Sequence, residues 1–176
     1  MAEPNILHDL NPVTHITAGA VGKPGKRTFY LQGQQAMTIV TLVVEKEQVA
    51  ALGKGIDELA ERLGVGDAAA RLNALEMELS QPIEPLFRVG QLGLGYDAEE
   101  KMMVLVAYEA SEEENIDLIN AVRFWATTDQ MRSLARHIAS VVAAGRAICV
   151  LCGKPIDPDG HFCPKRNGHG EKATLT

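Results

Sequence analysis

Three cysteines near the C-terminal end of the chain have the spacing of metal ligands. Cys149 and Cys152 enclose two residues and are followed by Gly153, and Cys163 comes ten residues after that glycine. Two thiolates one tight turn apart can face the same ion, and the glycine lets the backbone curl beneath the sulfur atoms. This half of a zinc-ribbon pattern, with a third cysteine nearby, predicts a bound zinc ion.

A tetrahedral zinc site needs a fourth ligand, and the sequence offers two histidines for it. His161 belongs to the same compact segment as Cys163, whereas His169 is separated from Cys163 by five residues. We favour His161 and keep His169 as the alternative. The predicted ligands are therefore Cys149, Cys152, His161 and Cys163. Four protein ligands leave no position for water, so the predicted site is structural rather than catalytic.

Two other interpretations of these cysteines stay open. Residues 149–152 (CVLC) could be a thioredoxin-like dithiol, but such motifs open a helix, and Gly153 and Pro155 indicate a turn. The cysteines could also be inert. Zinc has the advantage of explaining how residues 146–176, a tail with few apolar side chains, could become ordered at all.

The remaining polar residues give weaker signals. His8 and Asp9 are adjacent, but neighbours on an extended chain point apart, and His137 lies beside an apolar helical stripe. Glutamates 112–114 lack the alternating Asp/Asn–Gly pattern of a calcium loop. We interpret all of these as surface or structural residues.

A further pair could hold a ligand. Arg123 and Trp125 alternate along a predicted strand and share one face, where they could hold an anion or stack on a base. We assign no catalytic residue and no cofactor other than zinc. Whether the protein is an enzyme stays open.

Two segments that copy one another set the architecture. Residues 45–63 and 127–145 each contain a predicted amphipathic helix, at 46–63 and at about 128–144, and a shift of 82 places Gln48 on Gln130. The same shift superimposes the two apolar stripes, which are Val49, Leu52, Ile56 and Leu59 in the first helix and Met131, Leu134, Ile138 and Val141 in the second. A capping box is predicted at Thr127 and Gln130, and a glycine C-cap at Gly64 and at Gly145.

Three predicted strands precede each helix. They cover residues 13–21, 27–32 and 37–44 in the first half, and 87–94, 101–108 and 120–127 in the second. A shift of 74 aligns the two first hairpins and places Gly19 on Gly93. The predicted fold class is α+β: two βββα units form a pseudo-twofold antiparallel-sheet domain with both helices packed on the sheet.

The predicted division of the chain follows from this pattern. Residues 1–145 form the duplicated domain, with repeats at about 13–64 and 87–145 and a connector at 65–86. Residues 1–12 are expected to be irregular, and a short helix starting at Asp67 is expected within the connector. Residues 146–176 form the zinc-knuckle-like tail.

Charge and hydropathy narrow the partners and the compartment. Residues 1–145 contain 12 basic and 20 acidic side chains, whereas residues 146–176 contain 5 basic and 3 acidic ones. An acidic body argues against nucleic acid as a general partner, because phosphate contacts supply most non-specific affinity. The sequence shows neither a run of about 18 apolar residues nor a secretory signal, so we expect a cytoplasmic protein without a membrane partner.

The chain also resembles a family of uncharacterised bacterial proteins of actinobacterial type, classed as a domain of unknown function. The matching segments are residues 29–32 (FYLQ), 81–84 (QPIE), 87–90 (FRVG) and 160–168 (GHFCPKRNG), which together span nearly the whole chain. The resemblance implies that His161 rather than His169 is the fourth ligand. It implies no mechanism.

Three functions are compatible with these observations. We favour a non-catalytic binding or adaptor protein whose zinc-bearing tail docks an unknown protein partner. The alternative is an enzyme or small-molecule binder with a pocket between the repeats, to which Arg88, Arg123 and the acidic loop could contribute. A weaker alternative is a nucleic-acid contact through Lys165 and Arg166 of the tail.

Overall fold

The computed structural model describes residues 3–66, 76–144, 147–153, 155–156, 161–167 and 172–173. The chain divides into two compact units, of which the first comprises Met1–Val21 and Thr28–Val142 and the second Gly22–Arg27 and Ala143–Thr176. The expectations for Asp67, Gly145 and His169 lie outside the described residues. Within the described part of the chain, every helix falls short of the length or apolar character needed to span a membrane.

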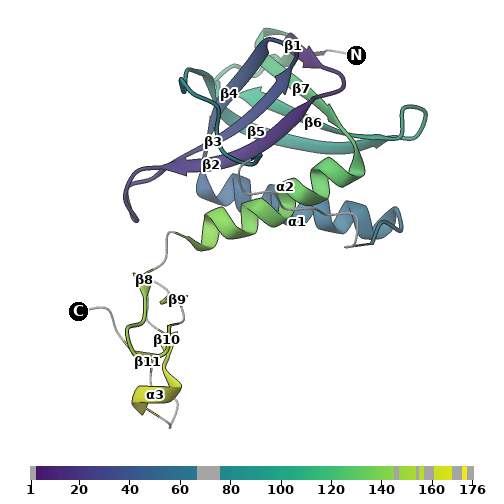
Figure 1. The fold of residues 1–176 in the computed structure, drawn as a ribbon. Coiled ribbons are helices and arrows are strands. Elements are labelled where there is room, and N and C mark those ends of the chain that lie inside the picture. Colours follow the sequence, from purple (N-terminus) through teal and green to yellow (C-terminus); the bar gives the residue numbers. More distant parts are fainter. Residues whose placement is uncertain are drawn as a thin grey trace. The chain divides into compact units, whose positions relative to one another are not determined.

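The first unit is built on a seven-stranded sheet with the order β1-β7-β6-β5-β4-β3-β2 (Figure 1). Its strands are β1 (Asn5–Leu10), β2 (His15–Val21), β3 (Thr28–Gln35), β4 (Thr38–Val44), β5 (Pro85–Asp97), β6 (Met102–Glu109) and β7 (Asn120–Ala126). Strands β2, β3 and β4 form one antiparallel run, and β5, β6 and β7 form another.

Two parallel pairings join these runs. Strand β5 begins beside β4, and β1 runs beside β7. A short link joins β1 and β2, the two edge strands of this order. It also bonds to the strand next to each edge, because Val13 N donates to Trp125 O of β7 and Thr14 N donates to Gln34 O of β3, each at 2.8 Å. The sheet therefore curls around a single core.

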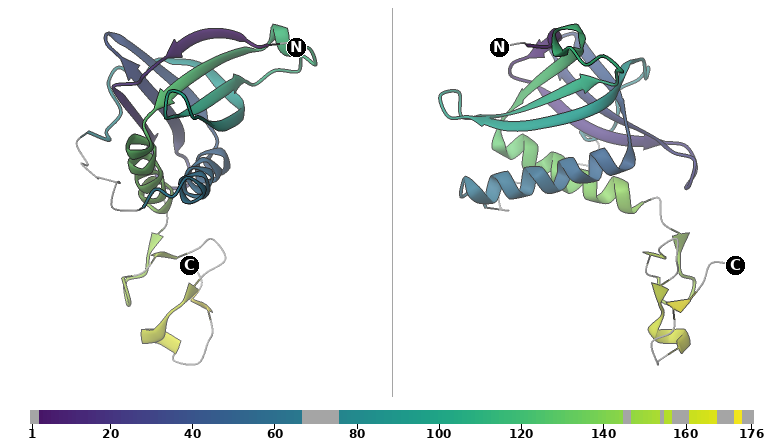
Figure 2. Two further views of the ribbon diagram at one scale, coloured as in Figure 1. Left: turned by 90° about the vertical axis from the view of Figure 1, so that its right-hand side faces the viewer. Right: turned by 180° about the vertical axis from the view of Figure 1, so that it is seen from behind.

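Helix α1 (Lys46–Arg62) follows β4, and helix α2 (Thr128–Ala143) follows β7. A short 3-10 helix, η2 (Ile116–Leu118), precedes β7. Figure 2 shows α1 and α2 side by side on the same side of the sheet. They approach closely, because a Cβ on Gly53 of α1 would lie 3.1 Å from Cγ2 of Ile138 in α2. Gly64, at a φ of +74°, ends α1 as predicted.

Alternating strand residues and one stripe of each helix fill the core. The largest fully buried apolar side chains are Phe124, Leu31, Leu42, Ile56, Met103, Leu105, Met131, Leu134, Ile138, Val49 and Val122. Phe124 packs directly on the backbone of Gly33, since a Cβ at that glycine would lie 2.4 Å from the ring. Of the predicted stripes, Leu59 and Val141, near the C-terminal ends of their helices, are only partly buried and pack against the core.

The prediction of a mixed α and β domain with a sheet and two long helices is confirmed. The prediction of an irregular N-terminal arm is wrong, because Asn5–Leu10 forms strand β1. This segment has no β-branched run of its own, and its partner strand β7 begins more than a hundred residues later. Pairing with a distant strand overrides the weak local propensity.

Candidate metal centre

The second unit consists of short elements around the three cysteines. Strand β8 (Ala147–Ile148) pairs with β9 (Pro155–Ile156), and β10 (His161–Phe162) pairs with β11 (Lys172–Ala173). Helix α3 (Pro164–Asn167) follows directly after Cys163. Cys149 therefore follows directly after strand β8, and Cys163 lies between strand β10 and the short helix α3.

The three sulfur atoms lie together. All of the Sγ atoms of Cys149, Cys152 and Cys163 are within 4.8 Å of one another, and those of Cys149 and Cys163 are 3.9 Å apart. Cys149 and Cys163 are buried and Cys152 is half-buried. Among the described residues, these cysteines are the one group of three or more side chains close enough to hold a metal ion.

The turn at residues 149–153 orients the first two sulfurs. Gly153 N donates to Cys149 O at 2.9 Å, and Gly153 has a φ of +73°, which a residue without a Cβ adopts without strain. Hydrogen bonds from the backbone of Cys152 and Leu151 lower the pKa of the Cys149 thiol below its ordinary value of 9.0. The turn therefore favours the thiolate, which is the form that binds metals.

The separation of the Cys149 and Cys163 sulfurs fits a tetrahedral ion. Bonds of about 2.3 Å from one ion to two thiolates place the sulfurs about 3.8 Å apart. The observed separation of 3.9 Å between Cys149 and Cys163 matches this edge. It is far longer than the ~2.05 Å of a disulfide bond, and all three cysteines are free thiols.

The fourth ligand is less defined. His161 is in β10, two residues before Cys163, but its side chain lies outside the described part of the structure. His169 lies outside the described residues altogether. The choice of His161 thus stays a prediction.

Arg123 and Trp125 do hold an anion, and it belongs to the chain itself. The Arg123 Nε and Nη2 atoms donate to the two carboxylate oxygens of Asp9 at 3.0 and 2.7 Å, and Trp125 Nε1 donates to Asp9 Oδ1 at 2.7 Å. The Arg123 guanidinium also lies over the Trp125 ring, 5.6 Å from its centroid. These contacts fasten β1 to β7 and satisfy the cation with an internal partner.

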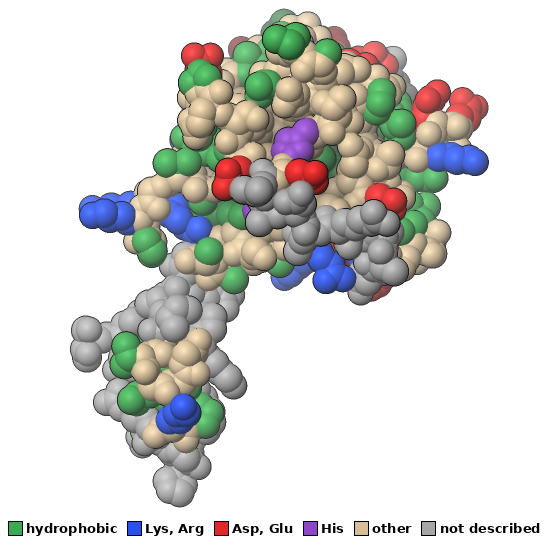
Figure 3. All heavy atoms as spheres, in the orientation of Figure 1, with side chains coloured by type: hydrophobic (Ala, Val, Ile, Leu, Met, Phe, Trp, Pro, Cys, Tyr) green, Lys and Arg blue, Asp and Glu red, His purple; other side chains and the backbone are tan. Residues whose placement is uncertain are grey.

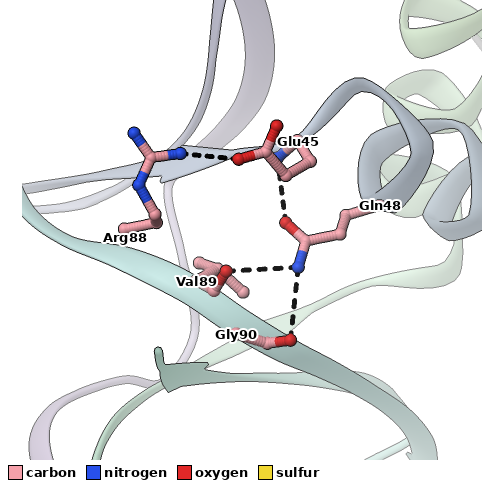
Figure 4. Close-up of polar contacts among 5 residues, drawn as sticks. All are labelled: Glu45, Gln48, Arg88, Val89 and Gly90. Carbon is pink, nitrogen blue, oxygen red and sulfur yellow. Dashed lines mark hydrogen bonds and ion pairs between the residues drawn. The ribbon is translucent and has the colours of Figure 1, made fainter. Parts of the chain in front are cut away.

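Arg88, the other predicted pocket residue, is paired as well. Its Nη1 atom lies 2.6 Å from Glu45 Oε1, and both side chains are largely exposed (Figure 4). The ion pair joins β5 to the start of α1. An exposed pair of this kind contributes little to stability, about 0–1 kcal/mol.

The histidines of the first unit occupy ordinary structural positions. Burial lowers the pKa of His15, and the charge of Glu76 acts in the opposite direction. Burial also lowers the pKa of His137, which contacts the Ala18 backbone. Figure 3 shows a histidine side chain with acidic side chains close to it, on the face of the molecule that is also seen in Figure 1.

A hollow does lie between the two predicted repeats. It measures about 250 Å³ and separates α1 residues, among them Leu52 and Gly55, from residues 90–94 of β5. Its lining is mainly apolar and includes neither Arg88 nor Arg123. An active or ligand-binding site there stays a prediction.

The acidic loop is a pair of local turns. Ser111 Oγ accepts a hydrogen bond from Glu113 N at 3.0 Å, and Asn115 Oδ1 accepts one from Asp117 N at 3.1 Å. Glutamates 112–114 are exposed. The loop is solvated, as the sequence indicated.

Comparison with known proteins gives one family. The family described as Protein of unknown function (DUF3090) matches residues 8–163. The chain belongs to this family. The match begins within β1 and extends to the third cysteine, so it covers both the sheet domain and the cysteine cluster. No curated protein and no solved structure matches the chain.

Proposed function

We propose that this protein is a non-catalytic binding or adaptor protein whose C-terminal tail is folded by a structural zinc ion and docks a protein partner. The observation that carries the proposal is the composition of the tail's buried centre. Its described members are Cys149 and Cys163, with Cys152 and Ile156 packed against them. Such a centre buries too little apolar surface to fold a small unit, whereas a metal bound to the thiolates could.

The donor set favours zinc over other metals. Thiolate ligands suit zinc, copper(I) and iron–sulfur clusters. Iron–sulfur clusters usually take four cysteines, and the whole chain has three. Three thiolates and the imidazole of His161 give the Cys₃His set common in structural zinc sites. With four protein ligands the zinc ion stabilises the fold of the tail and takes part in no reaction. The surface of the tail can then bind a partner.

The contacts of the first unit support binding rather than catalysis. Arg88 and Arg123, the two cations predicted to serve a pocket, have Glu45 and Asp9 as partners. The hollow between α1 and β5 is mainly apolar, and the Gln48 amide at its rim already bonds to the backbone of β5. Among the described residues, neither location offers a nucleophile beside a base.

We also propose that the sheet domain arose by duplication of a βββα unit. In the first half Leu31 pairs with Ala18 and Leu42, and in the second half Leu105 pairs with Leu94 and Phe124. The last strand of each half, β4 in the first and β7 in the second, also has a parallel neighbour, which is β5 for β4 and β1 for β7.

The pairing corrects one alignment. With Leu31 matched to Leu105, Gly19, opposite Tyr30, corresponds to Gly95, opposite Val104. Sequence alignment had placed Gly19 on Gly93. The error arises because the β2–β3 turn has two more residues than the β5–β6 turn.

Affinity capture from an extract of the native cells tests the binding role. Three baits are compared: the full chain, its Cys163→Ser variant, and its Met37→Ser variant, which changes an exposed side chain far from the cysteines in sequence. We expect a partner that is retained by the full chain and by Met37→Ser and lost with Cys163→Ser. Capture that is unchanged by Cys163→Ser, with zinc shown to be absent from that variant, would exclude a role of the tail in docking.

A further inference from the structure

The outer face of the first three-stranded run is covered by another part of the chain. Thr17, Gln32 and Thr41 pair side by side across β2, β3 and β4, and they are only 0%, 1% and 3% exposed. The cover is the stretch at residues 76–80, which precedes β5. Figure 1 shows this stretch crossing in front of β2 and β3.

The cover binds through its backbone and through one aliphatic side chain. Thr17 Oγ1 donates to Met77 O at 2.6 Å, and the Gln32 amide accepts from Ser80 N at 2.7 Å and donates to Ser80 O at 3.2 Å. The Leu79 side chain lies on Gly19, where a Cβ would be 2.8 Å from it. A short segment that begins with a turn is thus held on the sheet face by side-chain amide and hydroxyl groups and by Leu79, which packs on Gly19.

The corresponding rows of the second run are open. Gly93, Val106 and Arg123 form one row across β5, β6 and β7, and Gly95, Val104 and Trp125 form the next. Gly95 is exposed, and the other five are partly exposed. A Cβ on Gly95, the counterpart of Gly19, would meet no atom of the described chain within 4 Å. A hollow of about 310 Å³ lies here, lined by Gly93, Gly95, Val104 and Val106 among others.

The end of this hollow next to the β5–β6 turn is acidic. Asp97 is among its lining residues, and Glu99 and Glu100 follow it in the exposed turn, where Lys101 is the one basic side chain. Figure 2 shows the tip of this β5–β6 hairpin standing out from the sheet. Gln91 and Tyr108 pair with each other at the opposite end of the rows. Their side-chain amide and hydroxyl groups make no hydrogen bond to the described residues, so they are free to bond to a peptide backbone.

We propose that the open face of β5, β6 and β7 binds a short peptide segment of a partner protein, with an aliphatic side chain packed on Gly95 and a neighbouring Lys or Arg facing residues 97–100. The peptide occupies this face as residues 76–80 occupy the face of β2, β3 and β4. This inference rests on the binding role proposed above and assigns it a second surface, separate from the cysteine tail.

A displayed library of random peptides, selected against the full chain, tests the proposal. We expect enriched sequences to share a Leu, Ile or Met next to a Lys or Arg. Synthetic peptides of that sequence should shift the backbone amide signals of Gly93 and Gly95 in NMR spectra of the full chain. Enrichment without a shared sequence, or shifts confined to other strands, would overturn the proposal.

Matched variants sharpen the test. A side chain at position 95 would extend into open space, so Gly95→Leu should fill the hollow without disturbing the fold. It should weaken peptide binding about ten- to a hundredfold, which corresponds to the burial of one aliphatic side chain. Gly66→Leu, also in open space, should leave binding unchanged. Glu99→Lys with Glu100→Lys should weaken binding and reduce its salt dependence.

Two further outcomes are decisive. Peptide binding should survive Cys163→Ser, because the proposed site is on the sheet and not in the tail. Loss of binding in this variant would contradict the peptide site and would not count against the zinc site proposed for the tail. A chain that dimerises in solution, and becomes monomeric with Gly95→Leu, would show that a second copy occupies this face instead of a partner peptide.

Discussion

Gln48 and Gln130 make matching contacts in the two halves of the sheet domain. Gln48 Oε1 accepts from the backbone N of Glu45, and its Nε2 donates to Val89 O and Gly90 O of β5 (Figure 4). Gln130 Oε1 accepts from the backbone N of Thr127, and its Nε2 donates to Val13 O before β2. Each glutamine therefore caps its own helix and fastens it to the first strand segment of the other half.

Replacing either glutamine should destabilise the domain to a similar extent. Gln48→Ala and Gln130→Ala each remove one capping bond and at least one bond to the sheet, so we expect a loss of about 1–2 kcal/mol in the free energy of unfolding. Urea denaturation followed by circular dichroism measures it. Gln34→Ala, which removes a bond to Ala36 O on the exposed β3–β4 turn, is the control. One glutamine proving neutral while the other is costly would contradict the matching roles.

Gly33 should tolerate no side chain. A Cβ there would overlap the Phe124 ring at 2.4 Å, so Gly33→Ala should lose about 1–3 kcal/mol through overpacking. Gly93→Ala is the matched control, because its Cβ would make an ordinary contact of 3.8 Å with Tyr108. Thermal unfolding of both variants measures the difference. Adding Phe124→Leu to Gly33→Ala should recover part of the loss, and additive losses would mean that the two positions are not coupled.

The Asp9 carboxylate should make stability depend on pH. Its hydrogen bonds to Arg123 lower its pKa in the folded protein below the ordinary 3.8. A lowered folded-state pKa gives stability that is present above the unfolded-state value and is lost as the pH falls through the folded one. With side chains 36% and 40% exposed, the ion pair contributes no more than about 1 kcal/mol.

Asp9→Asn should therefore be less stable than the wild type at about pH 6, and the gap should close below about pH 4. Trp125 is the single tryptophan of the chain and bonds to Asp9, so its fluorescence reports the unfolding directly. Met37→Ser serves as a control without a charge change. A gap that persists or widens at low pH would show that Asp9 acts through something other than its charge.

Local sequence patterns were sufficient for the two long helices, α1 and α2, and for six strands of the sheet. The stripe from Val49 to Ile56 and the capping box at Thr127 and Gln130 depend on residues close in sequence, and both are confirmed. Strand β1 and the parallel pairings were missed, because they depend on contacts between segments far apart in the chain, such as Asp9 with Arg123. An isolated Asp in an N-terminal segment gives no signal of such a partner.

The cysteine cluster could be predicted because its spacing is local. Cys149 and Cys152 share one turn, and Cys163 lies within the same short unit. The sequence offered Arg123 as a possible anion-binding residue, and the anion that it holds is Asp9 of the same chain. Sequence alone could not show this, since it gives the chemistry of a side chain without its partner.

The fourth metal ligand can be assigned by substitution. His161→Ala should lower zinc affinity about tenfold or more and shift the visible absorption of the cobalt-substituted protein, because a nitrogen ligand is lost. His169→Ala should leave both unchanged. The reverse pattern would assign His169, and no effect from either would mean that the fourth ligand is neither histidine.

The zinc content of the full chain, purified without chelator, is the most direct test of the central claim that the tail is organised by a metal. We expect about one equivalent of zinc in the wild type and in Met37→Ser, and a small fraction of that in Cys163→Ser. Less than about half an equivalent in the wild type, or equal content in Cys163→Ser, would contradict the claim.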